Sequence, residues 1–276
     1  MNIKLKQIQI VTALFDIQRE SHDGRSVDEY LTYLGDMLFN FSDVIVFHNC
    51  IPQSYIESYP KAYFCHLEIS ELPLFAHLED IKKVNERHLS YPEADLVNKS
   101  NYYGIVINSK IHLLALAGKI SKSPYLLWID AGISRLNLGK FPSAPNTSFS
   151  KFSNYQGVFQ IDLRNWIRNF KMYKSPSNWI SLGSSTRVVG AGIFLLSREF
   201  VSELDKVLKK YILENLRRGI WDTEQVNLFF VLANYRVLYI IQKKNDLTSI
   251  LDDIFSPNRN KARTFYNKVI QLLLKY

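Results

Sequence analysis

Apolar runs alternate along the chain with segments whose apolar residues recur at helical spacing. Runs rich in β-branched and aromatic residues predict strands over residues 8–15, 43–48, 62–69, 124–130, 158–163, 188–196 and 237–241. Apolar positions three and four apart predict helices over residues 27–41, 109–119, 199–216, 222–234 and 263–276. This alternation predicts an α/β fold, with a mixed, mostly parallel sheet flanked by helices on both faces.

The remaining segments carry neither pattern. Residues 71–100 are mixed and charged, which is typical of helix and loop. Residues 136–156 are rich in Ser, Asn, Pro and Lys, and residues 175–185 are also rich in turn formers. A loop of that length inside a compact domain is usually functional or mobile.

The length of 276 residues suits one large α/β domain with a small helical addition. We place the domain at residues 1–242 and a C-terminal helical extension, packed on it, at residues 243–276. Apolar residues make up 47% of the chain, which is enough for a sizeable core. The 16 Tyr and 17 Phe residues either fill that core or offer surfaces on which sugars stack.

Cysteine usage and the chain's start bear on its location. Cys50 and Cys65 are the two cysteines, and their spacing matches no zinc or redox motif. Such scarcity suits a reducing compartment. The first residues form no apolar run of signal-peptide length, and no stretch approaches the roughly 20 apolar residues of a membrane span. We therefore expect a cytoplasmic protein that meets its substrates in solution or at a membrane surface.

The net charge of +8 suits nucleic acid, an acidic membrane face or phosphate-bearing ligands. Nucleic acid is excluded as a partner, since zinc-finger spacing, RNP-like aromatics and a basic leucine zipper are all absent. The helix predicted at 263–276 pairs basic with apolar residues, as helices at a membrane interface do. That pattern predicts peripheral membrane contact, and packing of the helix on the domain is the alternative.

Several chemistries lack their sequence signatures. The chain contains no P-loop, no Gly-x-Gly-x-x-Gly fingerprint, no Gly-x-Ser-x-Gly elbow and no His-Glu-x-x-His helix. Its six histidines show no metal-ligand spacing. Gly190 and Gly192 lie inside an apolar strand, where glycines allow a ligand or another backbone to approach closely.

In open α/β sheets, ligands bind beyond the carboxyl ends of the strands. Asp16, Asn49 and Asp130 each follow a predicted strand directly. Asp130 ends the most apolar run and precedes Ala131 and Gly132. Its carboxylate suits a phosphate-bound Mg²⁺ or Mn²⁺, and capping of the following turn is the alternative.

Three segments resemble the HtrL/YibB (WlaTC/HtrL) family of bacterial surface-polysaccharide glycosyltransferases. They are Ile10-Val-Thr-Ala-Leu-Phe-Asp-Ile-Gln-Arg19, Asn108-Ser-Lys-Ile111 after Tyr91-Pro-Glu93, and Tyr125-Leu-Leu-Trp-Ile-Asp-Ala-Gly-Ile133. A weaker similarity lies at Val189-Gly-Ala-Gly-Ile-Phe194. The resemblance covers roughly the first 200 residues. It implies a GT-A-like fold and transfer of a sugar from a nucleotide-sugar donor to a surface-polysaccharide or lipid-linked glycan acceptor.

The resemblance also implies a divalent cation, Mn²⁺ or Mg²⁺, on Asp130. GT-A enzymes usually hold this metal through an Asp-x-Asp motif. In this chain Asp130 is followed by Ala131 and Gly132, so one carboxylate stands where two are common.

The residues expected to bind the donor follow from what the reaction requires. A departing nucleoside diphosphate develops negative charge that cations stabilise. Arg19 and Lys110 are the candidates, beside the ion on Asp130, and surface or salt-bridge roles are the alternative. Thr12 and Asp16 would face the nucleoside or its ribose, and Gly132 would lie beside the donor.

The acceptor half depends on a general base if the reaction inverts configuration. Asp222 and Glu224, after Trp221, offer carboxylates at a predicted helix start. We favour Asp222 narrowly, and helix capping is the alternative for both. Gly190, Gly192 and Trp221 are the predicted acceptor-binding residues.

Two other functions fit the sequence. One is another nucleotide-dependent transferase, for polyol phosphates or nucleotidyl groups, on a similar sheet. The other is a noncatalytic carbohydrate-binding or membrane-associated protein, which the charge and the aromatic residues also suit. In that case Asp130 would do no more than cap a turn.

Overall fold

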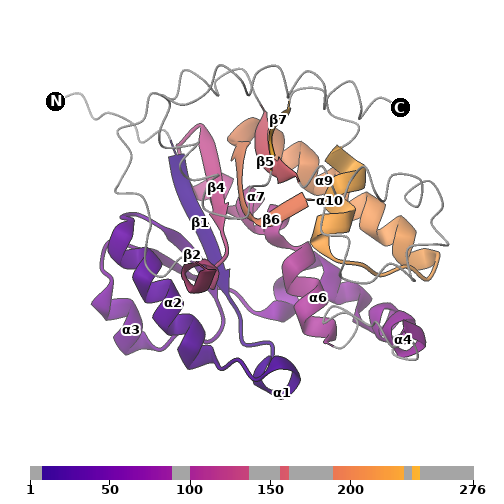
Figure 1. The fold of residues 1–276 in the computed structure, drawn as a ribbon, viewed down its shortest axis with the longest axis horizontal. Helices are drawn as coiled ribbons and strands as arrows, with labels where there is room; N and C mark the ends of the chain where they lie inside the picture. The colour runs from indigo at the N-terminus through magenta and orange to yellow at the C-terminus, as the bar shows by residue number, and fades with distance from the viewer. Residues whose placement is uncertain (1–7, 89–99, 137–155, 162–188, 233–237, 243–276) are drawn as a thin grey trace.

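The structure is a computed structural model and describes residues 8–88, 100–136, 156–161, 189–232 and 238–242. Its centre is a seven-stranded sheet with the order β3-β2-β1-β4-β6-β5-β7 (Figure 1). The strands are β1 (Ile8–Leu14), β2 (Ile45–His48), β3 (Tyr63–His66), β4 (Tyr125–Ile129), β5 (Gly157–Ile161), β6 (Val189–Ser197) and β7 (Leu238–Gln242).

Most neighbouring strands run parallel. β3, β2, β1 and β4 form a continuous parallel set, and β7 lies parallel to β5. β6 runs antiparallel to both of its neighbours, β4 and β5. The predicted α/β fold with a mixed, mostly parallel sheet is therefore confirmed. Because β1 and β4 are adjacent and parallel, their carboxyl ends open at the same edge.

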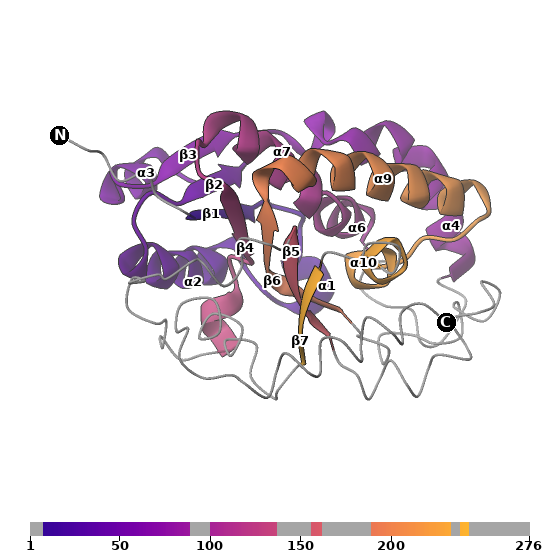
Figure 2. The same cartoon turned by 90° about the horizontal axis from the view of Figure 1, so that it is seen from above.

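Helices cover both faces of the sheet (Figure 2). One face packs against α2 (Val27–Asn40) and α3 (Gln53–Ser58). The other packs against the larger core, whose helices are α4 (Leu78–His88), α6 (Asn101–Asn108), α7 (Lys110–Ile120), α9 (Arg198–Arg217) and α10 (Glu224–Leu232). Short turns of helix complete the described chain: α1 (Glu20–Asp23), η1 (Ile69–Glu71), η2 (Pro73–His77) and η3 (Ile133–Leu136).

Alternation along the central strands divides the core in two. In β4, Leu126 and Trp128 face the α7 side, and Leu127 and Ile129 face the α2 side. This is the two-residue period of a strand buried on both faces. Asp130 continues the parity of Trp128, which directs its carboxylate toward α7.

The α2 helix shows how local signals fix an element. Ser26 accepts a hydrogen bond from the backbone N–H of Glu29, and the Glu29 side chain accepts one from the backbone N–H of Ser26. This capping box satisfies two backbone donors that the helix start would otherwise leave unpaired. Leu34, Met37 and Leu38 then bury the apolar face against the sheet.

The helix predicted at 109–119 is preceded by a helix that the sequence pattern does not predict, in the residues that follow the mixed region at 71–100. α6 ends at Asn108 and α7 begins at Lys110, with Ser109 between them at φ −96°, ψ 2°. The Ser109 hydroxyl donates to the carbonyl of Ile105 at 2.8 Å. Neither Gly nor Pro marks this break, so apolar periodicity runs through it. The break places Lys110 at the first position of α7.

Some predicted elements lie outside the described residues. They are the helix at 263–276 with its membrane contact, the extension at 243–276, nearly all of the loop at 136–156, and residues 175–185. The strand predicted at 62–69 is shorter, since β3 ends at His66. Among the described helices, none combines the length and the apolar character needed to cross a membrane.

Candidate functional site

A cleft of about 1360 Å³ opens where β1 and β4 end. The loop after β1, the turn after β4, the start of α7, the beginning of β6 and the start of α10 line it. The cleft brings together most residues that the sequence singled out: Asp16, Arg19, Lys110, Asp130, Gly132, Gly190, Gly192 and Glu224.

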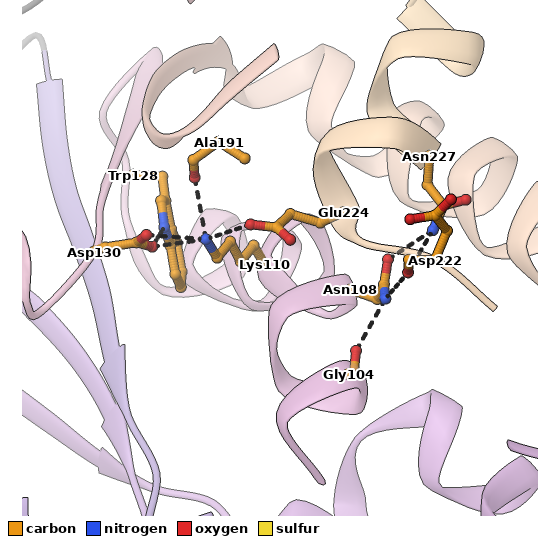
Figure 3. A network of polar contacts seen from close by, with 9 residues as sticks. All are labelled: Gly104, Asn108, Lys110, Trp128, Asp130, Ala191, Asp222, Glu224 and Asn227. Carbon is orange, nitrogen blue, oxygen red and sulfur yellow. Dashed lines mark hydrogen bonds and ion pairs between the residues drawn. The ribbon is translucent and has the colours of Figure 1, made fainter. Parts of the chain in front are cut away.

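Lys110 connects the two carboxylates at the centre of the cleft (Figure 3). Its Nζ lies 2.9 Å from Oδ1 and 3.1 Å from Oδ2 of Asp130, and 2.9 Å from Oε1 of Glu224. It also donates to the backbone carbonyl of Ala191 at 3.2 Å. Three partners match the three N–H donors of an ammonium group. The indole Nε1 of Trp128 donates to Oδ1 of Asp130 at 2.6 Å, which fixes that carboxylate from a second side.

Burial and charge act together on these groups. The Lys110 and Glu224 side chains are each 8% exposed, whereas that of Asp130 is 37% exposed. Burial lowers the pKa of Lys110, but the charges of Asp130 and Glu224 outweigh it, so the pKa is raised and the lysine stays ionised. Burial raises the pKa of Glu224, and Asp130 adds to this while Lys110 opposes it. The cluster therefore holds a fixed ammonium between a buried and a partly exposed carboxylate.

An irregularity in β6 supplies the carbonyl partner of Lys110. Val158 pairs with Leu195, but Gln160 pairs with Gly190, so the ladder between β5 and β6 shifts register. Ala191 lies in the shifted segment, and its carbonyl turns to Lys110. The backbone N–H of Asp130 donates to the carbonyl of Gly192 at 2.8 Å. Bulges of this kind are frequent next to active sites because they redirect backbone and side chains.

Replacing Lys110 with methionine is expected to lower the free energy of unfolding by about 3–5 kcal/mol, the usual cost of removing one partner from a buried ion pair. Glu224 would be left buried without its counter-ion. Because the pKa of Lys110 is raised in the folded protein, the stabilisation that the lysine provides is complete below its unfolded pKa of about 10.4 and is lost as pH rises through its higher folded pKa. Urea denaturation across pH checks both statements.

The control for this experiment is Lys82→Met. Lys82 and Glu79 also pair at 2.7 Å, but on the surface of α4, where ion pairs contribute little. Lys82→Met should leave the unfolding midpoint unchanged. The double variant Lys110→Met/Glu224→Gln should regain part of the lost stability. Equal, small losses for Lys110→Met and Lys82→Met would show that the buried cluster does not stabilise the fold.

A second network fixes the start of α10 (Figure 3). The Nδ2 group of Asn108 donates to the backbone carbonyl of Asp222 at 3.0 Å and to that of Gly104 at 3.0 Å. The Nδ2 group of Asn227 donates to Oδ1 of Asn108 at 2.9 Å. The segment Asn108-Ser-Lys110 thus holds the α10 start through Asn108 and Glu224 itself through Lys110.

The loop after β1 is also fixed by polar contacts. The backbone N–H of Asp16 donates to Oδ1 of Asn49 at 2.8 Å, which ties the ends of β1 and β2 together. The Asp16 carboxylate accepts from the backbone N–H of Gln18 at 2.9 Å. Asp16 is exposed and lines the cleft. The guanidinium of Arg19, three residues on, lies over the rings of Tyr30 and Tyr103.

Three predicted site residues lie elsewhere. Thr12 is fully buried within β1, and Trp221 is 3% exposed and packs into the core on the α7 side. The Asp222 carboxylate accepts from the backbone N–H of Thr223 at 2.7 Å. None of the three lines the cleft in the part of the chain that the structure describes. Thr12 points to the same face of β1 as Ile10 and Leu14, which face α2. Trp221 was open to either position, because an indole side chain occurs in cores as well as on surfaces.

Other cleft residues were not predicted. Tyr30, Tyr103 and Trp128 line the cleft, and Asn227 supports it. Tyr103 lies in α6, a helix that the sequence pattern does not predict. A signal for this helix was present at Ser100, whose side chain accepts from the backbone N–H of Tyr103 and caps the helix. Tyr30 and Trp128 occupy apolar positions of the helix predicted at 27–41 and the strand predicted at 124–130, and this periodicity does not reveal their contacts with Arg19 and Asp130.

Comparison with solved structures identifies the fold. Core-mannan synthase A (CmsA/Ktr4) from Aspergillus fumigatus, in its Mn/GDP form, superposes with a TM-score of 0.51 at 8% identity, over 88% of this chain and 74% of that one. The apo form of the glycosyltransferase GlyE from Streptococcus pneumoniae TIGR4 aligns with a TM-score of 0.41 at 9% identity, over 86% and 45%. The expected GT-A-like fold is confirmed, and structural neighbours of the chain are glycosyltransferases.

Sequence comparison identifies the family. No curated protein matches the chain significantly. The family described as "Bacterial protein of unknown function (HtrL_YibB)" matches residues 6–244. That range includes every residue of the cleft and of the two networks around Lys110 and Asn108. The chain belongs to the HtrL/YibB family.

Proposed function

We propose that this protein is a glycosyltransferase that moves a sugar from a nucleotide-sugar donor to a glycan acceptor. The observation that carries the proposal is the Asp130–Lys110–Glu224 cluster, which lines a large cleft at the carboxyl ends of β1 and β4. Open α/β sheets bind their ligands at this edge. The GT-A-like fold and the glycosyltransferase neighbour support the same reading.

The donor would bind between the loop after β1 and the tip of β4. Asp16 offers an exposed carboxylate to the hydroxyls of a nucleoside. Arg19 offers a cation to the diphosphate, which gains negative charge as the sugar departs. Lys110 has its donors engaged by protein atoms. Its role would be to orient Asp130 and Glu224 and to set the charge of the cluster.

Asp130 is the residue that would hold a divalent cation. Its carboxylate accepts from Trp128 and Lys110, yet the side chain remains 37% exposed and lines the cleft. Asp130 and Glu224 together carry one more charge than Lys110 neutralises, which favours a further cation. Among the described residues no group of three or more His, Cys, Asp or Glu side chains gathers. Mg²⁺ and Mn²⁺ suit such a site, because one carboxylate with substrate phosphates and waters suffices. The ion would neutralise the leaving diphosphate.

The acceptor would approach from the side of β6 and α10. Gly190, Gly192 and Glu224 line that part of the cleft. A Cβ atom at Gly192 would lie 3.4 Å from Oδ2 of Asp130, in van der Waals contact with the carboxylate. Glu224 is the general base in this proposal if the reaction inverts. A surface polysaccharide or a lipid-linked glycan is the proposed acceptor class, from the family resemblance.

A ligand panel tests the proposal. Purified protein is incubated with nucleoside diphosphates, nucleoside triphosphates and nucleotide sugars, each with Mn²⁺ or with EDTA. One nucleoside diphosphate should raise the melting temperature, since a ligand at about 100 times its Kd stabilises by about 2.7 kcal/mol. Its sugar conjugate should be hydrolysed slowly.

The panel also separates the alternatives. Selective stabilisation by a triphosphate would indicate a nucleotidyl transferase. Indifference to every nucleotide, with or without metal, would contradict the proposal and favour a noncatalytic carbohydrate-binding protein. The EDTA arm reports whether the ion on Asp130 contributes to donor binding.

A further inference from the structure

Arg19 reaches the cleft through a constrained turn. Gln18 adopts φ 55°, in the left-handed region that residues other than glycine seldom occupy. The Asp16 carboxylate accepts from the Gln18 backbone N–H and so holds this turn. Such conformations persist where the surrounding structure imposes them. The turn sets the direction of Arg19, which is partly buried.

Two tyrosine rings receive the guanidinium. Its Cζ atom lies 5.5 Å from the ring centroid of Tyr30 and 5.0 Å from that of Tyr103. Both distances are within the range of a cation–π contact. Tyr30 comes from α2 and packs on the core of that face, whereas Tyr103 comes from α6 and packs on the opposite core. Arg19 therefore joins the two helical layers at the open edge of the sheet.

Gly132 has no side chain, and the space that this leaves is filled by the Tyr30 ring. A Cβ atom at Gly132 would stand 2.7 Å from Cε1 of Tyr30, closer than real atoms approach. Gly132 is two residues after Asp130, in the turn that ends β4. Any side chain here would displace the ring that contacts Arg19. The Asp130-Ala-Gly132 segment thus supplies the Asp130 carboxylate and also leaves room for the Tyr30 ring that contacts Arg19.

We propose that Tyr30 and Tyr103 are positioning residues that hold the Arg19 guanidinium ready for the donor's diphosphate, with Gly132 providing room for Tyr30. The inference rests on the proposed function. A guanidinium that lies over aromatic rings binds phosphate oxygens through N–H groups in its own plane, in bidentate fashion. Because the side chain is already ordered, binding costs less conformational entropy.

Inorganic pyrophosphate is the probe. Its affinity for the wild-type protein and for matched variants is measured by calorimetric titration. Tyr103→Phe keeps the ring and should bind as the wild type does. Tyr103→Leu and Tyr30→Leu remove a ring and should each weaken binding about 3- to 30-fold, the affinity equivalent of one cation–π contact. Arg19→Lys keeps the charge without the planar group and should also bind more weakly. Melting temperatures identify variants that do not fold.

The outcomes separate this inference from the proposed function. Wild-type affinity in both leucine variants, with binding lost in Arg19→Ala, would overturn the role of the tyrosines and leave the donor site standing. Wild-type affinity in Arg19→Ala would overturn the inference and remove Arg19 from the donor site. The nucleotide panel would still decide on transferase activity. If Tyr103→Leu fails to fold, Tyr30→Leu carries the test, since Tyr30 is partly exposed.

Discussion

Replacement of Asp130 by alanine is expected to abolish sugar transfer while the fold survives. Asp130 is the partly exposed carboxylate of the cluster, and its removal leaves Lys110 with Glu224 and the Ala191 carbonyl as partners. The buried pair therefore persists. The loss falls on the cleft, where the carboxylate would hold the donor's diphosphate through a cation. Turnover at saturating donor and the melting temperature are the measurements.

Asp130→Asn refines this experiment. The asparagine carbonyl, in the position of Oδ1, still accepts from Trp128 and Lys110, so the variant loses the negative charge and the single contact between Oδ2 and Lys110. Turnover should remain near zero if the charge matters and return if only the hydrogen bonds matter. Asp205→Ala is the control, because Asp205 pairs with His112 at 3.0 Å on α7 and α9, among residues that do not line the cleft. Near wild-type turnover in Asp130→Ala would refute the metal-centred donor site.

The strands that build the site were the most predictable part of the fold. β4 is a continuous apolar run and β1 is mostly apolar, each leads to a carboxylate, and the structure places the two strands side by side. Burial on both faces of a parallel sheet demands such runs. The break between α6 and α7 was not predicted, because Ser109 ends one helix and opens the next while apolar spacing continues on either side.

The candidate site was predictable as separate residues but not as a cluster. The strand-end rule indicated Asp130, and the need for cations indicated Lys110 and Arg19. Lys110 and Glu224 are 114 positions apart, and their contact at 2.9 Å depends on how α7 and α10 pack. Local sequence carries no record of that packing. The position of Thr12, by contrast, depends only on local sequence. Side chains alternate along β1, so Thr12 lies on the same face as Ile10 and Leu14, the face toward α2.

The choice between Asp222 and Glu224 also depended on tertiary structure. Both stand at the start of a predicted helix, where carboxylates favour capping. In the structure the Asp222 side chain bonds the backbone N–H of Thr223, and its carbonyl is held by Asn108. Glu224 instead lines the cleft and contacts Lys110. The sequence-based preference for Asp222 as the base therefore gives way to Glu224 as the proposed base.

Glu224→Gln is expected to lower turnover by at least about 100-fold, the usual minimum for a lost general base, if the reaction inverts configuration. The glutamine carbonyl can still accept from Lys110, so donor affinity and melting temperature should change little. Burial raises the pKa of Glu224, which makes the carboxylate a stronger base. The acid limb of the pH profile should thus lie above the ordinary glutamate value of about 4.3 and disappear in the variant.

Asp222→Asn is the matched control for that variant, two residues away at the same helix start. Its amide oxygen can still accept from Thr223, and its side chain does not line the cleft within the described residues. Turnover should stay near wild type. Comparable losses in both variants would indicate that the α10 start acts as a structural unit. Full turnover in Glu224→Gln would place the base on another residue, because an amide cannot take the acceptor's proton as a carboxylate does.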